Sequence, residues 1–199
     1  MLLYSTLLNF LECSTTIYIE FKRKKINNGT SPQRFKIHSH PNTLHRIASM
    51  TLSSSSSIRF AAALKDMNVW VMNVVPVDSA DTLPIIYERG LFGMYHDWCE
   101  SFSTYPRSYD LLHADHLFSK LKKRCKLLPV MVEVDRILRP EGKLIVRDGR
   151  DTAAEVESIL RSLHWEVRMT VSKQGEVMLC AEKTMWRPKE VEKAATTAS

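Results

Sequence analysis

The segment Tyr109–Asp148 constrains the fold most, because it reads as a complete strand–helix–strand unit. Residues 109–114 form an apolar run that ends in polar side chains, and residues 143–147 form a second short apolar run. Between them, apolar side chains recur at helical spacing on one face: Leu127, Val130, Met131, Val134, Ile137 and Leu138. Pro140 and Gly142 are expected to end this helix, since proline cannot continue the hydrogen-bond ladder and glycine tolerates a left-handed turn. Two strands joined in this way predict a right-handed crossover in a parallel sheet.

The residues before this unit extend the sheet on one side. Val69–Val75 is a nearly continuous β-prone run, which predicts a buried parallel strand. A short helix is expected at Thr82–Arg89, because Pro84 stands in its first turn and Gly90 lies just past its end. Another short strand is expected within Gly93–Trp98.

The residues after the unit predict one more helix and a hairpin. Thr152 and Glu155 fit a capping box at the start of an amphipathic helix. Trp165–Val171 and Glu176–Glu182 are two strands with a join short enough for an antiparallel hairpin. The chain therefore predicts an α/β fold whose sheet is parallel until the last strand reverses.

The charge distribution separates an N-terminal arm from the rest of the chain. The net charge is +6, yet residues 1–57 carry seven Lys or Arg and two Asp or Glu, while residues 58–199 carry twenty-one against twenty. A nucleic-acid-binding core therefore has no support from charge. With its serine run, residues 1–57 are expected to be a divergent, flexible arm, residues 58–188 the domain, and residues 189–199 a frayed tail.

Cysteine spacing and the apolar start of the chain give two further expectations. The four cysteines are widely spaced without a Cys-x-x-Cys pair, so we expect free, mostly buried thiols and neither a zinc site nor a disulfide framework. The first 21 residues contain Glu12 and Glu20, and an acidic residue is costly within a membrane helix. A convincing membrane anchor is therefore not evident in the sequence.

Three long segments are more specific than the order of strands and helices: Val69–Asp78, Ile86–Phe102 and Tyr105–Phe118. Together with Asp135–Gly142 and Glu182–Pro188, they closely resemble a plant family of S-adenosylmethionine-dependent methyltransferases, over about residues 60–188. The resemblance implies a class I, Rossmann-like methyltransferase sheet with a C-terminal antiparallel hairpin. It also implies S-adenosylmethionine as cofactor, a Golgi membrane location and a role in pectin and cell-wall biosynthesis.

The sequence departs from the family just before Phe60–Leu64. Family members carry there a strand that ends in an acidic residue, followed by a glycine-rich turn that holds the methionine part of the cofactor. Here the place is taken by Ser53–Arg59, which contains no glycine. The chain thus resembles a truncated C-terminal piece with an unrelated leader, lacking the first strand and the glycine-rich turn. We expect either a gap in the centre of the sheet or a substitute strand from residues 15–40, such as Thr16–Phe21.

The resemblance places cofactor-binding groups after two of the strands. Asn73 or Asp78 would accept hydrogen bonds from the ribose hydroxyls, and Asn73 fits less well because an amide accepts more weakly than a carboxylate. Asp97 would accept from the adenine amino group, with Trp98 stacking on the ring or walling it. The structural alternatives are a turn asparagine, a helix-capping Asp78, a loop Asp97 and a buried tryptophan.

The resemblance also places the methyl acceptor near His113, Asp115 and His116, at the end of the central strand. A histidine there is a candidate general base for a hydroxyl acceptor. A carboxylate acceptor, such as a uronic acid of pectin, needs no base because it is already ionised. The structural alternative is that these groups only satisfy backbone at a strand end. Methyl transfer requires no metal.

A dense basic run follows the central strand: Lys120, Lys122, Lys123, Arg124 and Lys126. It is typical of a solvated loop, and it also fits a surface for an anionic, pectin-like polysaccharide. Two functions stay open from sequence: a methyltransferase that modifies such a polysaccharide, or a non-catalytic remnant of the fold that does not bind the cofactor.

Overall fold

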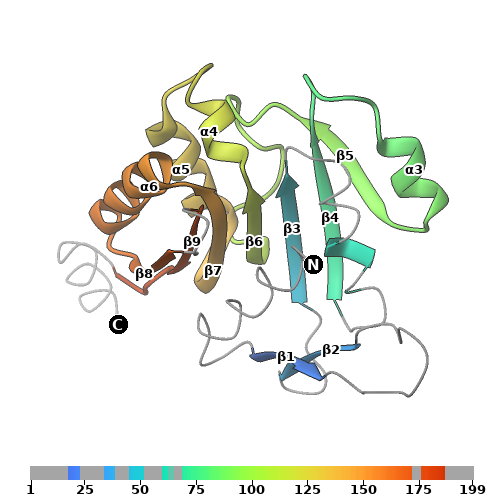
Figure 1. Cartoon of the computed structure of the whole chain (residues 1–199), viewed down its shortest axis with the longest axis horizontal. Coiled ribbons are helices and arrows are strands. Elements are labelled where there is room, and N and C mark those ends of the chain that lie inside the picture. The colour runs from blue at the N-terminus through green and yellow to red at the C-terminus, as the bar shows by residue number, and fades with distance from the viewer. Residues whose placement is uncertain are drawn as a thin grey trace, which may run out of the picture.

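A seven-stranded sheet forms the centre of the computed structural model, in the order β5-β4-β3-β6-β7-β9-β8 (Figure 1). The structure describes residues 18–22, 34–38, 45–51, 60–62, 64, 69–171 and 176–186. The strands of this sheet are β3 (His45–Thr51), β4 (Val69–Pro76), β5 (Phe92–His96), β6 (Tyr109–Asp115), β7 (Leu138–Gly149), β8 (Glu166–Val171) and β9 (Glu176–Glu182). The helices described over their full length are α3 (Leu83–Glu88), α4 (Leu117–Leu121), α5 (Leu127–Ile137) and α6 (Arg150–Ser162).

The pairing directions confirm the α/β fold expected from the sequence. β5, β4, β3, β6 and β7 run parallel to their neighbours. β9 pairs antiparallel with both β7 and β8, which makes the C-terminal hairpin. Strands β4 and β6 thus lie in one sheet and run in one direction, as a class I methyltransferase sheet requires.

The centre of the sheet corrects the expectation of a missing strand. β3 fills the place between β4 and β6, with Ile47 in register with Val71 on one side and Leu111 on the other. The expected gap is wrong, and the substitute strand comes from residues 45–51, after the proposed range 15–40. The buried, small or apolar residues 47–49 suit a strand that is covered on both faces.

The start of the domain also differs from the expected one, because β3 belongs to the sheet. The expected substitute, Thr16–Phe21, overlaps β1 (Tyr18–Lys22), which pairs antiparallel with β2 (Arg34–His38) in a separate two-stranded sheet. Because β3 is part of the large sheet, that sheet begins before residue 58, where the domain was expected to start. The serine run 53–57 and the tail 189–199 lie outside the described residues.

Alternate side chains of the central strands pack into two different apolar clusters. Leu112 and Leu144 belong to the larger cluster, which includes the buried face of α5. Their neighbours Leu111 and Ile145 belong to a second cluster that contains Ala61. Adjacent residues of a strand point to opposite faces, so the two clusters lie on the two faces of the sheet. Within the described part of the chain, no helix is long and apolar enough to span a bilayer.

Two helix boundaries differ from the sequence prediction. α6 starts at Arg150 with Gly149 as its N-cap and without a side-chain cap bond, so the capping box expected at Thr152 is wrong. Thr152 is instead buried inside the helix, since its side chain lies on the inward face. Strand β7 starts at Leu138, immediately after α5, and runs through Pro140 with a register shift on β6.

The expectation of free thiols is also wrong. Cys99 and Cys125 form a disulfide with their Cα atoms 5.9 Å apart, although 26 positions separate them in sequence. None of the cysteines within the described residues is free. Spacing along the chain could not show this pairing, because the fold brings the loop after β5 against the loop before α5.

Candidate functional site

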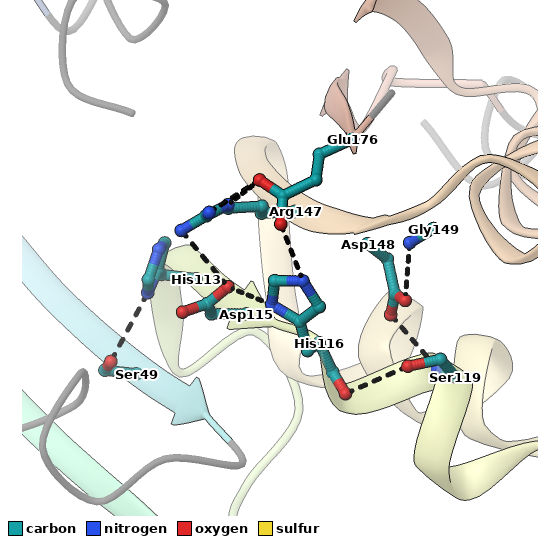
Figure 2. Close-up of polar contacts among 9 residues, drawn as sticks. All are labelled: Ser49, His113, Asp115, His116, Ser119, Arg147, Asp148, Gly149 and Glu176. Atoms are coloured by element: carbon teal, nitrogen blue, oxygen red, sulfur yellow. Dashed lines mark hydrogen bonds and ion pairs between the residues drawn. The ribbon is translucent and has the colours of Figure 1, made fainter. Parts of the chain in front are cut away.

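Polar side chains gather where the parallel strands end (Figure 2). Thr51 of β3 is in register with Asp115 of β6, and Asp115 is in register with Arg147 of β7. Glu176, the first residue of β9, pairs with Gly149 at the same edge. The carboxyl edge of the sheet is where open α/β folds bind their ligands, so this group of residues is the candidate site.

An ionic network joins the ends of β6, β7 and β9. His116 Nδ1 lies 2.6 Å from Asp115 Oδ1, and His116 Nε2 lies 3.3 Å from Glu176 Oε1. Arg147 donates from Nε and Nη2 to Glu176 Oε2, at 3.0 and 2.6 Å. The backbone of His116 has a φ of 54°, a left-handed turn that lets the chain leave β6 and enter α4. His116 thus sits between two carboxylates with its side chain 39% exposed.

His113 lies deeper, within a buried polar row that crosses the three central strands. Asn73, Ser49 and His113 are in register on neighbouring strands and all are buried. Ser49 Oγ and His113 Nδ1 lie 3.4 Å apart, and the Phe60 ring stacks on the imidazole with centroids 4.3 Å apart. Burial lowers the pKa of His113 to about 4.

The two histidines therefore suit different roles. At neutral pH His113 is uncharged, and a base with so low a pKa accepts a proton weakly. His116 is reachable from solvent and is held by carboxylates on both ring nitrogens. Of the predicted catalytic residues, His116 with Asp115 is placed to move a proton, whereas His113 is placed to support the strand end.

Asp78 and Asp97 stand beyond the ends of β4 and β5, as the sequence predicted, and both are engaged by the basic run. Lys120 Nζ donates to Asp78 Oδ1 at 2.9 Å. Arg124 donates from Nη1 and Nη2 to the two oxygens of Asp97, at 3.2 and 2.5 Å. These hydrogen bonds lower the pKa of both carboxyl groups. The two acids are therefore ionised acceptors at neutral pH.

Asn73 and Trp98 are placed less favourably for a cofactor. Asn73 lies inside β4, and its amide donates to the Phe92 carbonyl at 2.7 Å, so it serves the sheet and not a turn. Trp98 is 2% exposed, and its ring stacks on Phe102 with centroids 5.2 Å apart. Stacking of adenine on Trp98 would require this aromatic cluster to open. Trp98 can therefore at most form a wall beside the adenine ring.

Several residues of the site were not predicted from sequence. Arg147 stands at the end of a predicted strand, so its position at the sheet edge could have singled it out. Glu176 and Phe60 carry no such signal, because their partners are distant in sequence. Ser49 was missed because its strand was taken for part of the arm.

The chemistry of these residues fits S-adenosylmethionine in part. Two carboxylates, Asp78 and Asp97, follow β4 and β5, and carboxylates accept well from ribose hydroxyls and from an adenine amine. Within the described residues, no group of three or more His, Cys, Asp or Glu side chains could hold a metal ion.

Comparisons with known proteins bear on the family and the fold of the chain. A family profile described as "Putative S-adenosyl-L-methionine-dependent methyltransferase" matches residues 29–184, so the match starts well before residue 60 and includes β3. Probable methyltransferase PMT26 of Arabidopsis thaliana is 71% identical over 133 residues, which are 67% of this chain and 16% of that protein. The chain therefore spans about a sixth of the length of this relative.

Solved structures support the fold. A SAM-dependent methyltransferase from Aquifex aeolicus has a TM-score of 0.56 at 12% identity, over 69% of this chain and 81% of that one. The T. thermophilus 16S rRNA N2 G1207 methyltransferase, solved in complex with AdoMet and guanosine, has a TM-score of 0.53 at 14% identity, over 75% of this chain and 38% of that one.

Proposed function

The chain belongs to this family of S-adenosyl-L-methionine-dependent methyltransferases, and we propose on that premise that it transfers a methyl group to an anionic, pectin-like polysaccharide. The observation that carries the proposal is the ionic network of His116, Asp115, Arg147 and Glu176 at the carboxyl edge of a class I sheet. The cofactor supplies the methyl group on a sulfonium, which needs little covalent help from the protein.

The protein's part is to hold the two reactants. Asp78 would accept from the ribose hydroxyls and Asp97 from the adenine amine, since both are ionised and lie just past the ends of β4 and β5. The acceptor must be held in line with the methyl group in a place that excludes water. Its position would be near the ends of β6 and β7, where His116 stands.

The acceptor group decides whether a base is needed. A uronic acid carboxylate reacts as it is, and Arg147 is the cation at the strand end that would orient it. A hydroxyl acceptor must lose a proton, and His116 would take it at Nε2 once the acceptor displaces Glu176 from that nitrogen, while Asp115 holds Nδ1. The two acceptors thus predict different dependence on His116.

An anionic polymer is favoured by the surface beside the site. Lys122, Lys123, Arg124 and Lys126 line a shallow cavity of about 520 Å³ together with Glu155. Lys122 pairs with Glu155 and Arg124 with Asp97, so the remaining two lysines add positive charge for a polymer. Polyanion binding to such a surface weakens as salt rises.

A second candidate function is a non-catalytic remnant of the fold. It is favoured by the sequence between Thr51 and Phe60, where the family carries a glycine-rich turn and this chain has no glycine. A remnant would keep the sheet and lose cofactor binding, so a binding measurement separates the two functions.

A Golgi location is part of the proposal and is supported by one structural feature. The Cys99–Cys125 disulfide belongs to oxidising compartments such as the secretory pathway. The family resemblance implies membrane association, and the proposal includes it. Among the described residues, no helix is long and apolar enough to be the anchor.

Transfer of a tritiated methyl group from S-adenosylmethionine to de-esterified polygalacturonate tests the function. Label that mild base releases is a methyl ester on a carboxylate, whereas stable label is an ether on a hydroxyl. We expect base-labile label, and His116→Gln should then retain most of the transfer. Neutral galactan is the control acceptor. Absence of transfer to polygalacturonate, with a relative of full length active in the same assay, would reject the proposal.

A further inference from the structure

The basic run lies across the two carboxylates assigned to the cofactor. We call residues Lys120–Cys125 the basic strap. Lys120 Nζ donates to Asp78 Oδ1 at 2.9 Å. Arg124 contacts both acids: Nη1 lies 3.7 Å from Asp78 Oδ2, and Nη2 lies 2.5 Å from Asp97 Oδ2. The strap therefore joins the loops after β4 and β5.

Asp97 has little capacity left for another donor. Its Oδ1 accepts from the Cys99 backbone N–H at 3.0 Å and from Arg124 Nη1 at 3.2 Å, and its Oδ2 accepts from Arg124 Nη2. An ionised carboxylate offers about four acceptor sites, so only one remains. A ligand amine that needs a well-aligned bond to Asp97 has to compete with the guanidinium.

A covalent link keeps the strap in place. Cys125 follows Arg124 directly, Cys99 lies two residues after Asp97, and the two cysteines form the disulfide. The link raises the effective concentration of Arg124 at Asp97, because the guanidinium cannot diffuse away when the ion pair opens. Since the carboxylate of Asp78 is 35% exposed and the Arg124 side chain 38%, the ion pairs themselves can exchange with solvent.

We propose that the basic strap is a gate on the cofactor edge: Lys120 and Arg124 occupy Asp78 and Asp97, and the Cys99–Cys125 disulfide holds them there. This rests on the proposed function, because it takes these two acids as the ribose and adenine acceptors. Binding of the adenosine moiety displaces Lys120 and Arg124, and removal of the disulfide makes that displacement easier.

Calorimetric titration of the 199-residue chain with S-adenosylhomocysteine tests the gate. Exposed ion pairs are each worth a factor of up to about five, so Lys120→Gln with Arg124→Gln should tighten binding by roughly three- to ten-fold. Replacing Cys99 and Cys125 by serine should change affinity in the same direction. The matched control is Lys122→Gln, which removes a strap charge paired with Glu155 and should leave affinity unchanged.

The sign of the effect decides the proposal. Weaker or unchanged binding in the Lys120/Arg124 double variant would overturn it, because the strap would then position the acids or be irrelevant to them. If neither the wild type nor any variant binds S-adenosylhomocysteine, the proposed function fails, and the gate fails with it.

Hydrogen exchange of the ligand-free chain tests the strap without any ligand. Amides of residues 119–126 should exchange faster in Asp97→Asn and in the double serine variant than in the wild type, while those of α6 stay unchanged. Equal rates over residues 119–126 would show that the strap is not held and would overturn the gate, even if S-adenosylhomocysteine binds.

Discussion

Lowering the pH should destabilise the fold through His113. Its pKa is lowered from 6.5 to about 4 because it is buried, with the charge of Arg147 adding to the effect and that of Asp115 opposing it. Above pH 6.5 the imidazole is neutral in both the folded and the unfolded chain, so stability does not depend on it there. As the pH falls below 6.5, the unfolded chain takes up a proton that the folded chain refuses, and stability is lost until the pH reaches about 4.

The shift of the pKa sets the magnitude. One pKa unit corresponds to about 1.4 kcal/mol, so the full loss between pH 6.5 and pH 4 is about 3 kcal/mol, and about 2 kcal/mol is lost by pH 5. This is a large part of the free energy of unfolding of an ordinary domain, which is about 5–15 kcal/mol. Most carboxyl groups remain ionised at pH 5, so the histidine term can be measured there.

Urea unfolding followed by circular dichroism at pH 7.5 and pH 5 measures the loss. The wild type should lose about 2 kcal/mol through His113, and His113→Gln should remove most of that dependence because the most strongly shifted imidazole is gone. A smaller dependence should remain from His96, whose pKa is also lowered by burial. His164→Gln, at an exposed histidine on the opposite edge of the sheet, is the matched control and should keep the wild-type slope. An unchanged slope in His113→Gln would refute the reasoning.

Two substitutions and the reduction of one disulfide test the packing and the links of the fold by urea unfolding. Gly93→Ala should cost about 1–3 kcal/mol, because the added Cβ would lie 2.8 Å from Leu83 Cδ2; no loss of stability would show that the helix yields. Arg136→Met should cost about 1–3 kcal/mol, since its guanidinium donates to two backbone carbonyls of the loop before β6, and an unchanged midpoint would count against these bonds. Reduction of Cys99–Cys125 should cost about 3 kcal/mol for a loop of this length, whereas equal midpoints with and without reductant would argue that no link forms.

The sequence predicted most of the sheet because its strands carry their own signals. The β-prone run of β4 and the helical spacing of α5 are local patterns, and each element lies within two residues of its expected bounds. β3 was missed because it follows a basic, polar segment and contains Ser49 and Arg46, which gave no sign of a buried central strand. Its burial is decided by the neighbours on both sides, which the local sequence does not show.

The site was only partly predictable for a similar reason. Position at a strand end singled out His116 and Asp97, since ligand groups in this fold gather there. The partners of those groups come from far along the chain: Glu176 reaches His116 from β9, and Arg124 reaches Asp97 from the strap. Charge counts predicted an exposed basic run, and the structure confirms that most of it is exposed. They could not show that Arg124 pairs with two acids.

The central claim is that the sheet completed by β3 still forms a cofactor-binding edge. Calorimetric titration of the 199-residue chain with S-adenosylmethionine tests it most directly. The account predicts saturable one-to-one binding in the micromolar range that excess S-adenosylhomocysteine abolishes. No detectable heat at ligand concentrations of about 1 mM, a free energy of binding weaker than about 4 kcal/mol, would contradict it.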